Sequence, residues 1–267
     1  MNYVGRVTAV IPAKNEEHQI AEAIRSAFLL ADSVLVIDDD SQDGTARVAI
    51  EQGAKVIKGC EHGGFIDKLF HFGFAQVDDG WILRLDADER VTEGLARELR
   101  KVMAEGKFVG ASFARLHYMF GAPVFFGGWF KPFQVGFFRA DSWDRSWKAG
   151  LHSQVPLKGE TRVIPPALGH TIHYDYETIE QFIQRSLVSY ARSEAAQKFE
   201  AGLRFKSGDL LIKPWVKFFG RFFVRKGYKD GERGMVLAAL LAAYEIAVAC
   251  FLWQLSKKEK ISSHSKK

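Results

Sequence analysis

Three groups of polar and acidic residues in the first hundred positions have the composition of a site for a cation and a phosphate. They are Pro12–Glu16 (PAKNE), Asp38–Asp40 (DDD) and Asp86–Glu89 (DADE). Carboxylates crowded in this way repel one another, so they need a cation or hydrogen-bond donors to stay ionised together. Asp86 and Asp88 have the Asp-x-Asp spacing that offers two oxygen ligands to Mg²⁺ or Mn²⁺. A divalent ion held there would bridge a diphosphate.

Each of these groups follows an apolar run that predicts a buried strand. Strands are predicted at Val7–Pro12, Val34–Ile37, Lys55–Lys58 and Trp81–Leu85. Helices are predicted at Glu16–Leu30, Thr45–Gln52, Gly63–Gln76 and, with Thr92 as N-cap, Thr92–Met103. This alternation predicts a doubly wound parallel sheet. Such sheets bind ligands beyond the carboxyl ends of their strands, where the acidic groups lie.

Acidic residues at strand ends also occur as helix N-caps and turn formers. One cluster alone fits either role, but three clusters at three strand ends favour a binding site. The chain has no GxGxxG after the first strand and no GxxxxGK[ST], so a dinucleotide-binding or P-loop domain would lack its phosphate-binding loop. We therefore expect phosphate to be held by a metal and by side chains.

Composition limits the class of protein without naming its ligand. Of 267 residues, 47% are hydrophobic and 26% charged, which excludes wholesale disorder. The net charge of +5 permits a phosphate-bearing ligand, an anionic membrane surface or nucleic acid. Two cysteines cannot form a disulfide framework, and this fits a reducing compartment. Because the first residues, MNYVGRVTAV, lack a basic segment followed by an apolar one, we expect no secretory signal.

Three motifs resemble a known enzyme family. In order and spacing, Val7–Glu17 (VTAVIPAKNEE), Val36–Thr45 (VIDDDSQDGT) and Leu83–Arg90 (LRLDADER) resemble the family 2 glycosyltransferases with the GT-A fold. Later segments are similar to the lipopolysaccharide inner-core β-1,4-glucosyltransferases: GGWF at 127–130, QVGFFR at 134–139, LHSQV at 151–155, HTIHY at 170–174 and KGYKDGERG at 226–234. The resemblance covers about residues 6–256.

The resemblance implies a nucleotide-sugar site. It places Asp39 on the base, usually uracil, Asp86 near the ribose, and Asp88 directly on the metal. Lys68 lies where the family often has a basic residue near the donor, although Leu69 stands where many members have Asn. The first nucleotide-binding turn is matched by Pro12, Ala13, Asn15 and Glu16.

Two further roles concern the metal and the catalytic base. His173 resembles a C-terminal histidine that completes the metal shell in many GT-A enzymes, with His170 as the alternative. Imidazole suits Mn²⁺ better than Mg²⁺. An inverting transferase needs a general base for the acceptor hydroxyl. The related subgroup often has His-Glu where this chain has His152-Ser153, so Asp144 or His152 is the candidate base. The alternatives are a turn role for Asp144 and a structural role for His152.

The second half predicts strands and then helices. Strands are predicted at Val109–Phe120, Gln134–Arg139, Leu151–Leu157 and Arg162–Ile164, and helices at Thr178–Gly202, Lys213–Lys226 and Met235–Leu255. Arg139 and the loop Trp129–Phe133 are candidates for contact with sugar rings or, alternatively, packing residues. We expect a nucleotide-sugar half at 1–106, an acceptor half of the same domain at 107–175, C-terminal helices at 176–256 and a disordered basic tail at 257–267.

The segment Lys213–Lys226 (KPWVKFFGRFFVRK) combines aromatic and basic residues at helical spacing. Its aromatic stripe is Trp215, Phe218, Phe219, Phe222 and Phe223; its basic flank is Lys213, Lys217, Arg221 and Arg225. This pattern is typical of a helix lying in a membrane interface, although the helix could also pack on the enzyme body.

Met235–Leu255 is long enough to span a bilayer. A charge near the middle of a span is costly, and Glu245 lies there. We therefore expect a buried or half-buried helix, with a true span as the alternative. The lysines of the tail would add attraction to an anionic leaflet. We expect a cytoplasmic protein, peripheral on the inner face of the cytoplasmic membrane.

These observations together predict the activity. We expect an α/β protein with a GT-A type, doubly wound, mostly parallel sheet and a C-terminal helical extension. The resemblance implies an inverting, Mn²⁺- or Mg²⁺-dependent transfer of a sugar, with UDP-glucose the expected donor, to a hydroxyl of a membrane-linked glycan such as lipopolysaccharide core. The alternatives are a membrane-associated, nucleotide-binding pseudoenzyme and a nucleotidyltransferase. A nucleic-acid partner is not expected, because the cleft is acidic.

Overall fold

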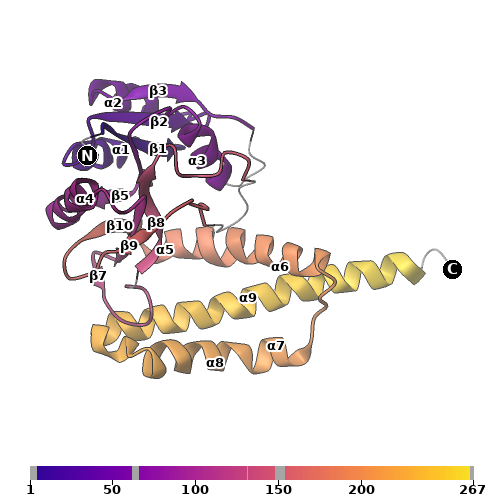
Figure 1. Ribbon diagram of the computed structural model, residues 1–267. Helices are drawn as coiled ribbons and strands as arrows, with labels where there is room; N and C mark the ends of the chain where they lie inside the picture. The colour runs from indigo at the N-terminus through magenta and orange to yellow at the C-terminus, as the bar shows by residue number, and fades with distance from the viewer. Residues whose placement is uncertain (1–4, 62–65, 131, 148–153, 265–267) are drawn as a thin grey trace. The chain divides into compact units, whose positions relative to one another are not determined.

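The computed structural model describes residues 5–61, 66–130, 132–147 and 154–264. The chain divides into two compact units. One consists of Met1–Leu116 and Phe130–Tyr174 and is called the sheet unit below; the other consists of His117–Trp129 and Asp175–Lys267 and is called the helical unit. Figure 1 shows the elements of both.

The sheet unit begins with the expected alternation of strand and helix. Its elements to residue 105 are β1 (Val7–Ala13), α1 (Ile20–Ala27), β2 (Ser33–Asp38), α2 (Thr45–Glu51), β3 (Lys55–Lys58), α3 (Ile66–Phe74), β4 (Trp81–Arg84), β5 (Glu89–Val91) and α4 (Glu93–Glu105). Thr92 is the predicted N-cap of α4, since its hydroxyl accepts a hydrogen bond from the Leu95 N–H at 3.3 Å. The helix ends at Gly106 in the left-handed conformation.

The later strands change the direction of the sheet. They are β6 (Gly110–Met119), β7 (Ala122–Val124), β8 (Pro132–Arg139), β9 (Thr161–Val163) and β10 (His170–Tyr176). The strand order is β3-β2-β1-β4-β8-β6-β10-β5. Pairing is parallel from β3 to β4, but β8 is antiparallel to both β4 and β6, and β10 is antiparallel to β5. The α/β class is confirmed, whereas the expectation of a mostly parallel sheet is corrected to a mixed one.

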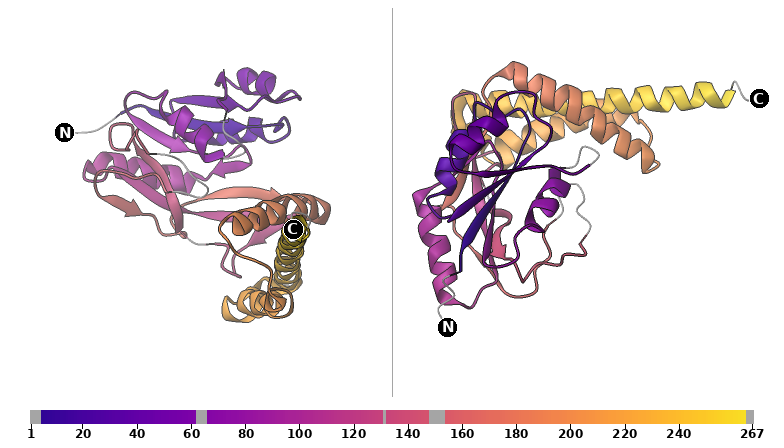
Figure 2. Two further views of the ribbon diagram at one scale, coloured as in Figure 1. Left: turned by 90° about the vertical axis from the view of Figure 1, so that its right-hand side faces the viewer. Right: turned by 90° about the horizontal axis from the view of Figure 1, so that it is seen from above.

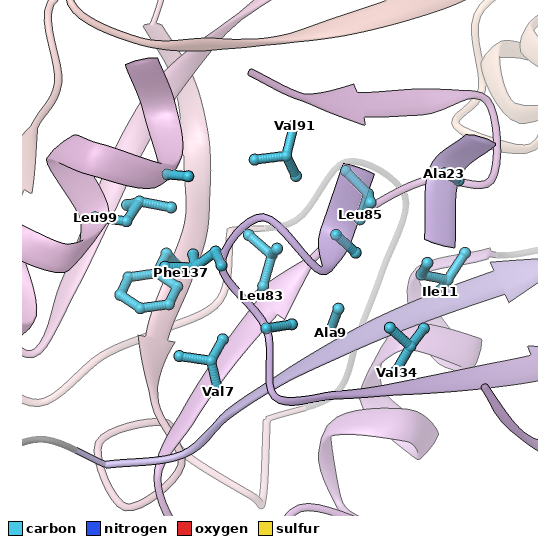
Figure 3. Close-up of a cluster of buried hydrophobic side chains, with 14 of the residues drawn as sticks. Val7, Ala9, Ile11, Ala23, Val34, Leu83, Leu85, Val91, Leu99 and Phe137 are labelled. Carbon is cyan, nitrogen blue, oxygen red and sulfur yellow. The ribbon is translucent and has the colours of Figure 1, made fainter. Parts of the chain in front are cut away.

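Alternation along β1 distributes side chains to the two faces of the sheet. Val7, Ala9 and Ile11 join one buried cluster, and Val10 joins another. Figure 3 shows the first cluster, in which residues of β1 meet Val34 of β2 and Leu83 of β4. Helices α1 and α4 contribute side chains to the first cluster and α3 to the second. The doubly wound arrangement fixes the carboxyl ends of β1, β2 and β4 along one edge.

The helical unit contains one long helix against which several shorter helices pack. Its helices are α5 (Ile179–Phe182), a π-helix Ile183–Tyr190, α6 (Ala191–Glu200), α7 (Ser207–Leu211), α8 (Lys213–Phe219), a π-helix Gly220–Val224, a 3₁₀-helix Gly227–Asp230 and α9 (Gly231–His264). Helix α9 packs against both α6 and α8. Figures 1 and 2 show α6 and α9 running side by side. The expected C-terminal helical extension is therefore present.

Helix α9 is also long and apolar enough to cross a membrane. The candidate span is Gly227–Glu259. Its most apolar 18-residue stretch has a mean hydropathy of 2.3, and 28% of that stretch is buried. Core helices of soluble proteins can have the same length and apolar composition as a membrane-spanning helix. Glu245 lies within this segment and pairs with Lys217 of α8 at 2.7 Å.

Several boundaries differ from the expected ones. The strand expected at Leu151–Leu157 is absent from its described part, residues 154–157, where Leu157 forms only an isolated bridge with Trp143. The tail expected to be disordered from Lys257 continues α9 as a helix to His264. The helix expected at Thr178–Gly202 starts at a capping box of Thr178 and Gln181 and then contains a π-helical stretch.

Candidate functional site

Hydrogen bonds join the turns at the ends of β1 and β2, which contain the first two of the three polar and acidic groups. The Asp39 N–H donates to the Ala13 carbonyl at 2.8 Å. The Asn15 N–H donates to Ser41 Oγ at 3.0 Å, and Asn15 Oδ1 accepts from the Gln42 N–H at 2.8 Å. Asn15 has a φ of 54°, a left-handed conformation that asparagine tolerates better than most residues. The turn of residues 12–16 is thus tied to the turn after Asp38.

The carboxylates of this pair of turns differ in how they are satisfied. Asp39 Oδ2 pairs with Lys14 Nζ at 3.0 Å, and the Asp39 side chain is largely buried. Asp38 Oδ2 accepts from the Ser41 N–H at 3.3 Å. The other oxygen, Asp38 Oδ1, is buried without a hydrogen-bond partner in the part of the chain that the structure describes. Buried acceptors are nearly always paired in folded proteins, so this oxygen marks a place for a donor from a ligand or a water.

Asp86 and Glu89 share one arginine. Arg115 on β6 lies 2.9 Å from Asp86 Oδ2 and also pairs with Glu89. Glu89 is buried, and burial raises the pKa of its carboxyl to about 7 against the opposing charge of Arg115. The sequence did not reveal Arg115 as a site residue, because its partners lie 29 and 26 positions earlier. The only local signal is an arginine in a strand that has no other arginine, lysine or acidic residue.

Asp88 and His173 are brought together as the resemblance implied. Asp88 Oδ2 lies 3.2 Å from His173 Nε2, and both side chains are nearly buried. Two backbone features hold them: His173 is in register with Glu89 in the β5–β10 pair, and the Tyr174 N–H donates to the Asp88 carbonyl at 2.9 Å. A carboxylate oxygen beside an imidazole nitrogen is a donor set suited to Mn²⁺. These residues therefore fit a divalent metal.

Sequence comparison identifies the family. The family model for "Glycosyl transferase family 2" matches residues 8–145, which contain all three acidic groups. The chain belongs to glycosyl transferase family 2. It is therefore a glycosyltransferase, in agreement with the resemblance of its motifs.

Relatives of this glycosyltransferase match nearly its whole length. An uncharacterised glycosyltransferase of Rickettsia typhi is 26% identical over 263 residues, which are 96% of this chain and 89% of that protein. The lipopolysaccharide core biosynthesis glycosyltransferase LpsC of Rhizobium meliloti is 23% identical over 252 residues, 93% of this chain and 92% of LpsC. The helical unit is thus included in these matches.

Solved structures match the glycosyltransferase over less than half its length. Glucosyl-3-phosphoglycerate synthase of Mycobacterium tuberculosis gives a TM-score of 0.35 at 20% identity, covering 43% of this chain and 45% of that one. Mannosyl-3-phosphoglycerate synthase of Rubrobacter xylanophilus gives 0.36 at 26% identity, covering 42% and 41%. At these scores the likeness carries no inference about ligands.

Of the two candidate bases, Asp144 and His152, the structure describes only Asp144. Asp144 Oδ1 accepts hydrogen bonds from the Ser146 N–H at 2.9 Å and from Ser146 Oγ at 2.7 Å. These bonds lower the pKa of the Asp144 carboxyl, which weakens it as a base. The geometry therefore favours the turn role. His152 and Ser153 lie outside the described residues.

Other predicted site residues have structural partners. His170 Nδ1 lies 3.1 Å from the Pro166 carbonyl, and its ring stacks edge-on with Phe130 at 5.3 Å. Arg139 pairs with the neighbouring Asp141. In the helical unit, Trp129 packs in an apolar cluster beneath the guanidinium of Arg221, 5.1 Å from the ring centre. These contacts favour packing over sugar binding for Trp129.

Lys68 lies on the exposed side of α3, and its neighbour Asp67 is buried. Asp67 Oδ1 pairs with Arg84 Nη2 at 3.0 Å, and the Arg84 guanidinium lies over the Phe70 ring at 4.1 Å. This second buried pair was not predicted. It joins α3 to the end of β4, just before Asp86.

Proposed function

We propose that this glycosyltransferase transfers a hexose, with UDP-glucose as donor, to a hydroxyl of a membrane-linked glycan such as lipopolysaccharide core, with inversion at the anomeric carbon. The contact of Asp88 with His173 at 3.2 Å carries the proposal, because these two residues would form a metal site at the strand edge where Asp39 and Asp86 also lie. The acceptor class is supported by LpsC, whose name places it in lipopolysaccharide core biosynthesis.

Asp88 and His173 would hold the divalent cation, with Asp86 beside them. When bound, such a cation supplies Lewis-acid stabilisation of the leaving diphosphate. Arg115 holds Asp86 and Glu89 in place, so the carboxylates can be crowded without opening the sheet. Nearly buried partners restrict the rotamers of the ligands, and this orients them before the donor arrives.

The base of the nucleotide would lie against the paired turns after β1 and β2. Asp39 is held by its own N–H and by Lys14, so its carboxylate has a fixed position. A uracil N–H is a donor of the kind that a fixed carboxylate accepts. Asn15 and Glu16 anchor the adjoining turn through Ser41 and Thr45, at 3.0 and 2.8 Å. The chain's own residues thus order the donor side before any ligand binds.

The helical unit would bind the surface of the membrane that carries the acceptor. Trp215, Phe219 and Phe223 form an exposed row, with Trp215 64% exposed, and successive rings stack at 6.3 and 5.6 Å. Phe218 and Phe222, the other members of the expected stripe, are half-buried. Exposed aromatic side chains next to basic ones favour an interfacial helix. We infer peripheral attachment on the cytoplasmic face, with α9 contributing its exposed apolar residues.

The test is transfer itself. The purified protein is incubated with membranes carrying truncated lipopolysaccharide core. Separate reactions each contain one donor: UDP-glucose, UDP-galactose, UDP-N-acetylglucosamine or GDP-mannose. We expect labelled sugar in the glycolipid from UDP-glucose when Mn²⁺ is present. Transfer from another donor would overturn the donor assignment. Nucleotide binding without hydrolysis or transfer of any sugar would indicate the pseudoenzyme instead.

A further inference from the structure

The helical unit contains a cavity that the proposed function does not use. It has a volume of about 490 Å³ and lies along α8 and the following π-helix, closed on one side by Glu245 of α9. Its charged lining consists of Lys213, Lys217, Arg221, Arg225 and Glu245. The four cations are spaced four residues apart, so they lie on one face of the helix.

Acidic side chains offset only part of this charge. Glu245 pairs with Lys217 at 2.7 Å, and Asp209 pairs with Lys213 at 2.6 Å. Among the described residues, neither Arg221 nor Arg225 forms an ion pair with a carboxylate, and their charges repel each other. Burial and the charge of Arg225 together lower the pKa of the Arg221 guanidinium. Each guanidinium presents a planar fork of N–H donors that matches the oxygens of a phosphate.

A glycine turn keeps the two arginines close. Arg221 Nη1 donates to the Gly127 carbonyl at 2.7 Å, and the Gly127 N–H donates to the Arg225 carbonyl at 2.9 Å. A Cβ at Gly128, where φ is +81°, would lie 2.7 Å from Arg225 Nη1. Any larger residue at this position would displace the Arg225 guanidinium. The GGWF segment, which is similar to the inner-core glucosyltransferases, thus supports the two arginines of an anion site.

The π-helix Gly220–Val224 lies in the middle of this face. Such segments are rare and are frequently found at functional sites. Val216 and Val224 also line the cavity and are 66% and 79% exposed. An anion that carries an apolar chain would therefore have a surface for both of its parts.

We propose that this cavity binds the phosphate group of a membrane lipid, with Arg221 and Arg225 on the phosphate and the exposed valines beside the lipid chain. The proposal deepens the proposed membrane attachment and rests on it: a general attraction to anionic surfaces becomes recognition of one headgroup chemistry. The aromatic row on the same helix would bring the cavity to the depth of the headgroups.

The test compares two kinds of vesicle at equal surface charge. Phosphatidylcholine vesicles containing phosphatidic acid present phosphate monoesters, and vesicles containing oleic acid present carboxylates. We expect the full-length protein to prefer the phosphatidic acid vesicles in a flotation assay, at least about ten-fold, because a phosphate accepts the arginine fork at more than one oxygen. Equal binding to both would overturn the proposal.

Two variants and one control locate the effect. Arg221→Gln with Arg225→Gln should abolish the preference, and Arg225→Lys, which keeps the charge, should reduce it while binding to oleic acid vesicles persists. Lys257→Gln with Lys258→Gln removes two charges from α9 outside the cavity. This control should weaken binding to both vesicle types alike. If this control loses the preference as much as the cavity variant, the proposal is wrong.

Inorganic phosphate distinguishes the source of the ligand. If free phosphate at low millimolar concentration displaces the protein from phosphatidic acid vesicles, the cavity binds a soluble phosphate and the lipid assignment fails. Retention on the vesicles supports the lipid. UDP titration of the same preparation reports on Asp39 and Asp88 in the sheet unit, so failure of the proposed function is recognised separately. Circular dichroism confirms that each variant is folded.

Discussion

The strand edge of the sheet unit and the face of α8 in the helical unit both carry many charges, but they hold them in opposite ways. At the strand edge, Asp88, Glu89 and His173 are nearly buried, and Arg115 and the β5–β10 register fix them. On the α8 face, Lys213 and Arg225 are exposed, as is the aromatic row that begins at Trp215. Buried pairs give the fixed geometry that chemistry needs. An exposed row suits a fluid surface, which has no fixed shape to match.

The largest expected effect would break this comparison on the sheet side. Asp88→Asn replaces a carboxylate with an amide, a weaker ligand for a hard cation, and should reduce UDP release from UDP-glucose by more than about 100-fold, beyond the usual loss for an outer-shell residue. The thermal midpoint should stay close to that of the wild type. The matched control is Asp141→Asn, an exposed aspartate of the same unit. Near wild-type turnover in Asp88→Asn would remove the metal from the mechanism.

Arg115→Met tests whether the buried pairs also hold the fold. It leaves Asp86 and the buried Glu89 without their shared cation, so the free energy of unfolding should fall by about 3 kcal/mol. Urea denaturation measures this. As the control, Arg47→Met removes exposed ion pairs with Glu17 and Glu51, and its free energy of unfolding should fall much less than that of Arg115→Met. Equal losses would mean that the carboxylates do not depend on Arg115.

A smaller effect is expected on the exposed row. Phe219→Ser with Phe223→Ser should weaken flotation with anionic vesicles by about ten-fold, because two large apolar side chains no longer enter the interface. The fold should be unaffected, since both rings are about half-exposed. Ile50→Ser, an exposed apolar residue of the sheet unit, should leave flotation unchanged. Undiminished flotation of the double variant would place the membrane contact elsewhere.

The smallest effect compares two helix starts. Thr92→Ala removes the N-cap of α4 and a hydrogen bond from Thr92 Oγ1 to the His170 carbonyl at 2.7 Å. The free energy of unfolding should therefore fall by about 1.5 kcal/mol. Thr178→Ala removes an exposed cap in the helical unit and should lose about 0.5 kcal/mol. A larger loss at Thr178 would reverse the expected order of the two units.

Local patterns predicted the first half of the fold well. The apolar runs gave β1 to β4 to within a residue or two at each end, because buried parallel strands leave a continuous hydrophobic signal. Strands β5 and β10 were missed. Glu89–Val91 has only three residues, and His170–Tyr176 is largely polar, so neither resembles a buried strand in isolation. Strand β5 forms by pairing with β10, and β10 itself lies between β6 and β5 in the sheet.

The candidate site shows the same limit. The motifs supplied Asp39, Asp86 and Asp88, and the resemblance supplied His173, which the structure places 3.2 Å from Asp88. Nothing local reveals Arg115 or the buried pair of Arg84 with Asp67, because a charge partner distant in the chain is set by sheet order. Likewise, the stripe of five aromatic rings follows from spacing, but its division into exposed and half-buried rows depends on how α8 packs.

Calorimetric titration with UDP, in Mn²⁺ and in EDTA, tests the account most directly. We expect the wild-type protein to bind UDP only when Mn²⁺ is present, and Asp88→Asn to lose this dependence together with tight binding. UDP bound equally well in EDTA, or bound tightly by Asp88→Asn, would contradict the claim that Asp88 and His173 form a metal site for a nucleotide-sugar.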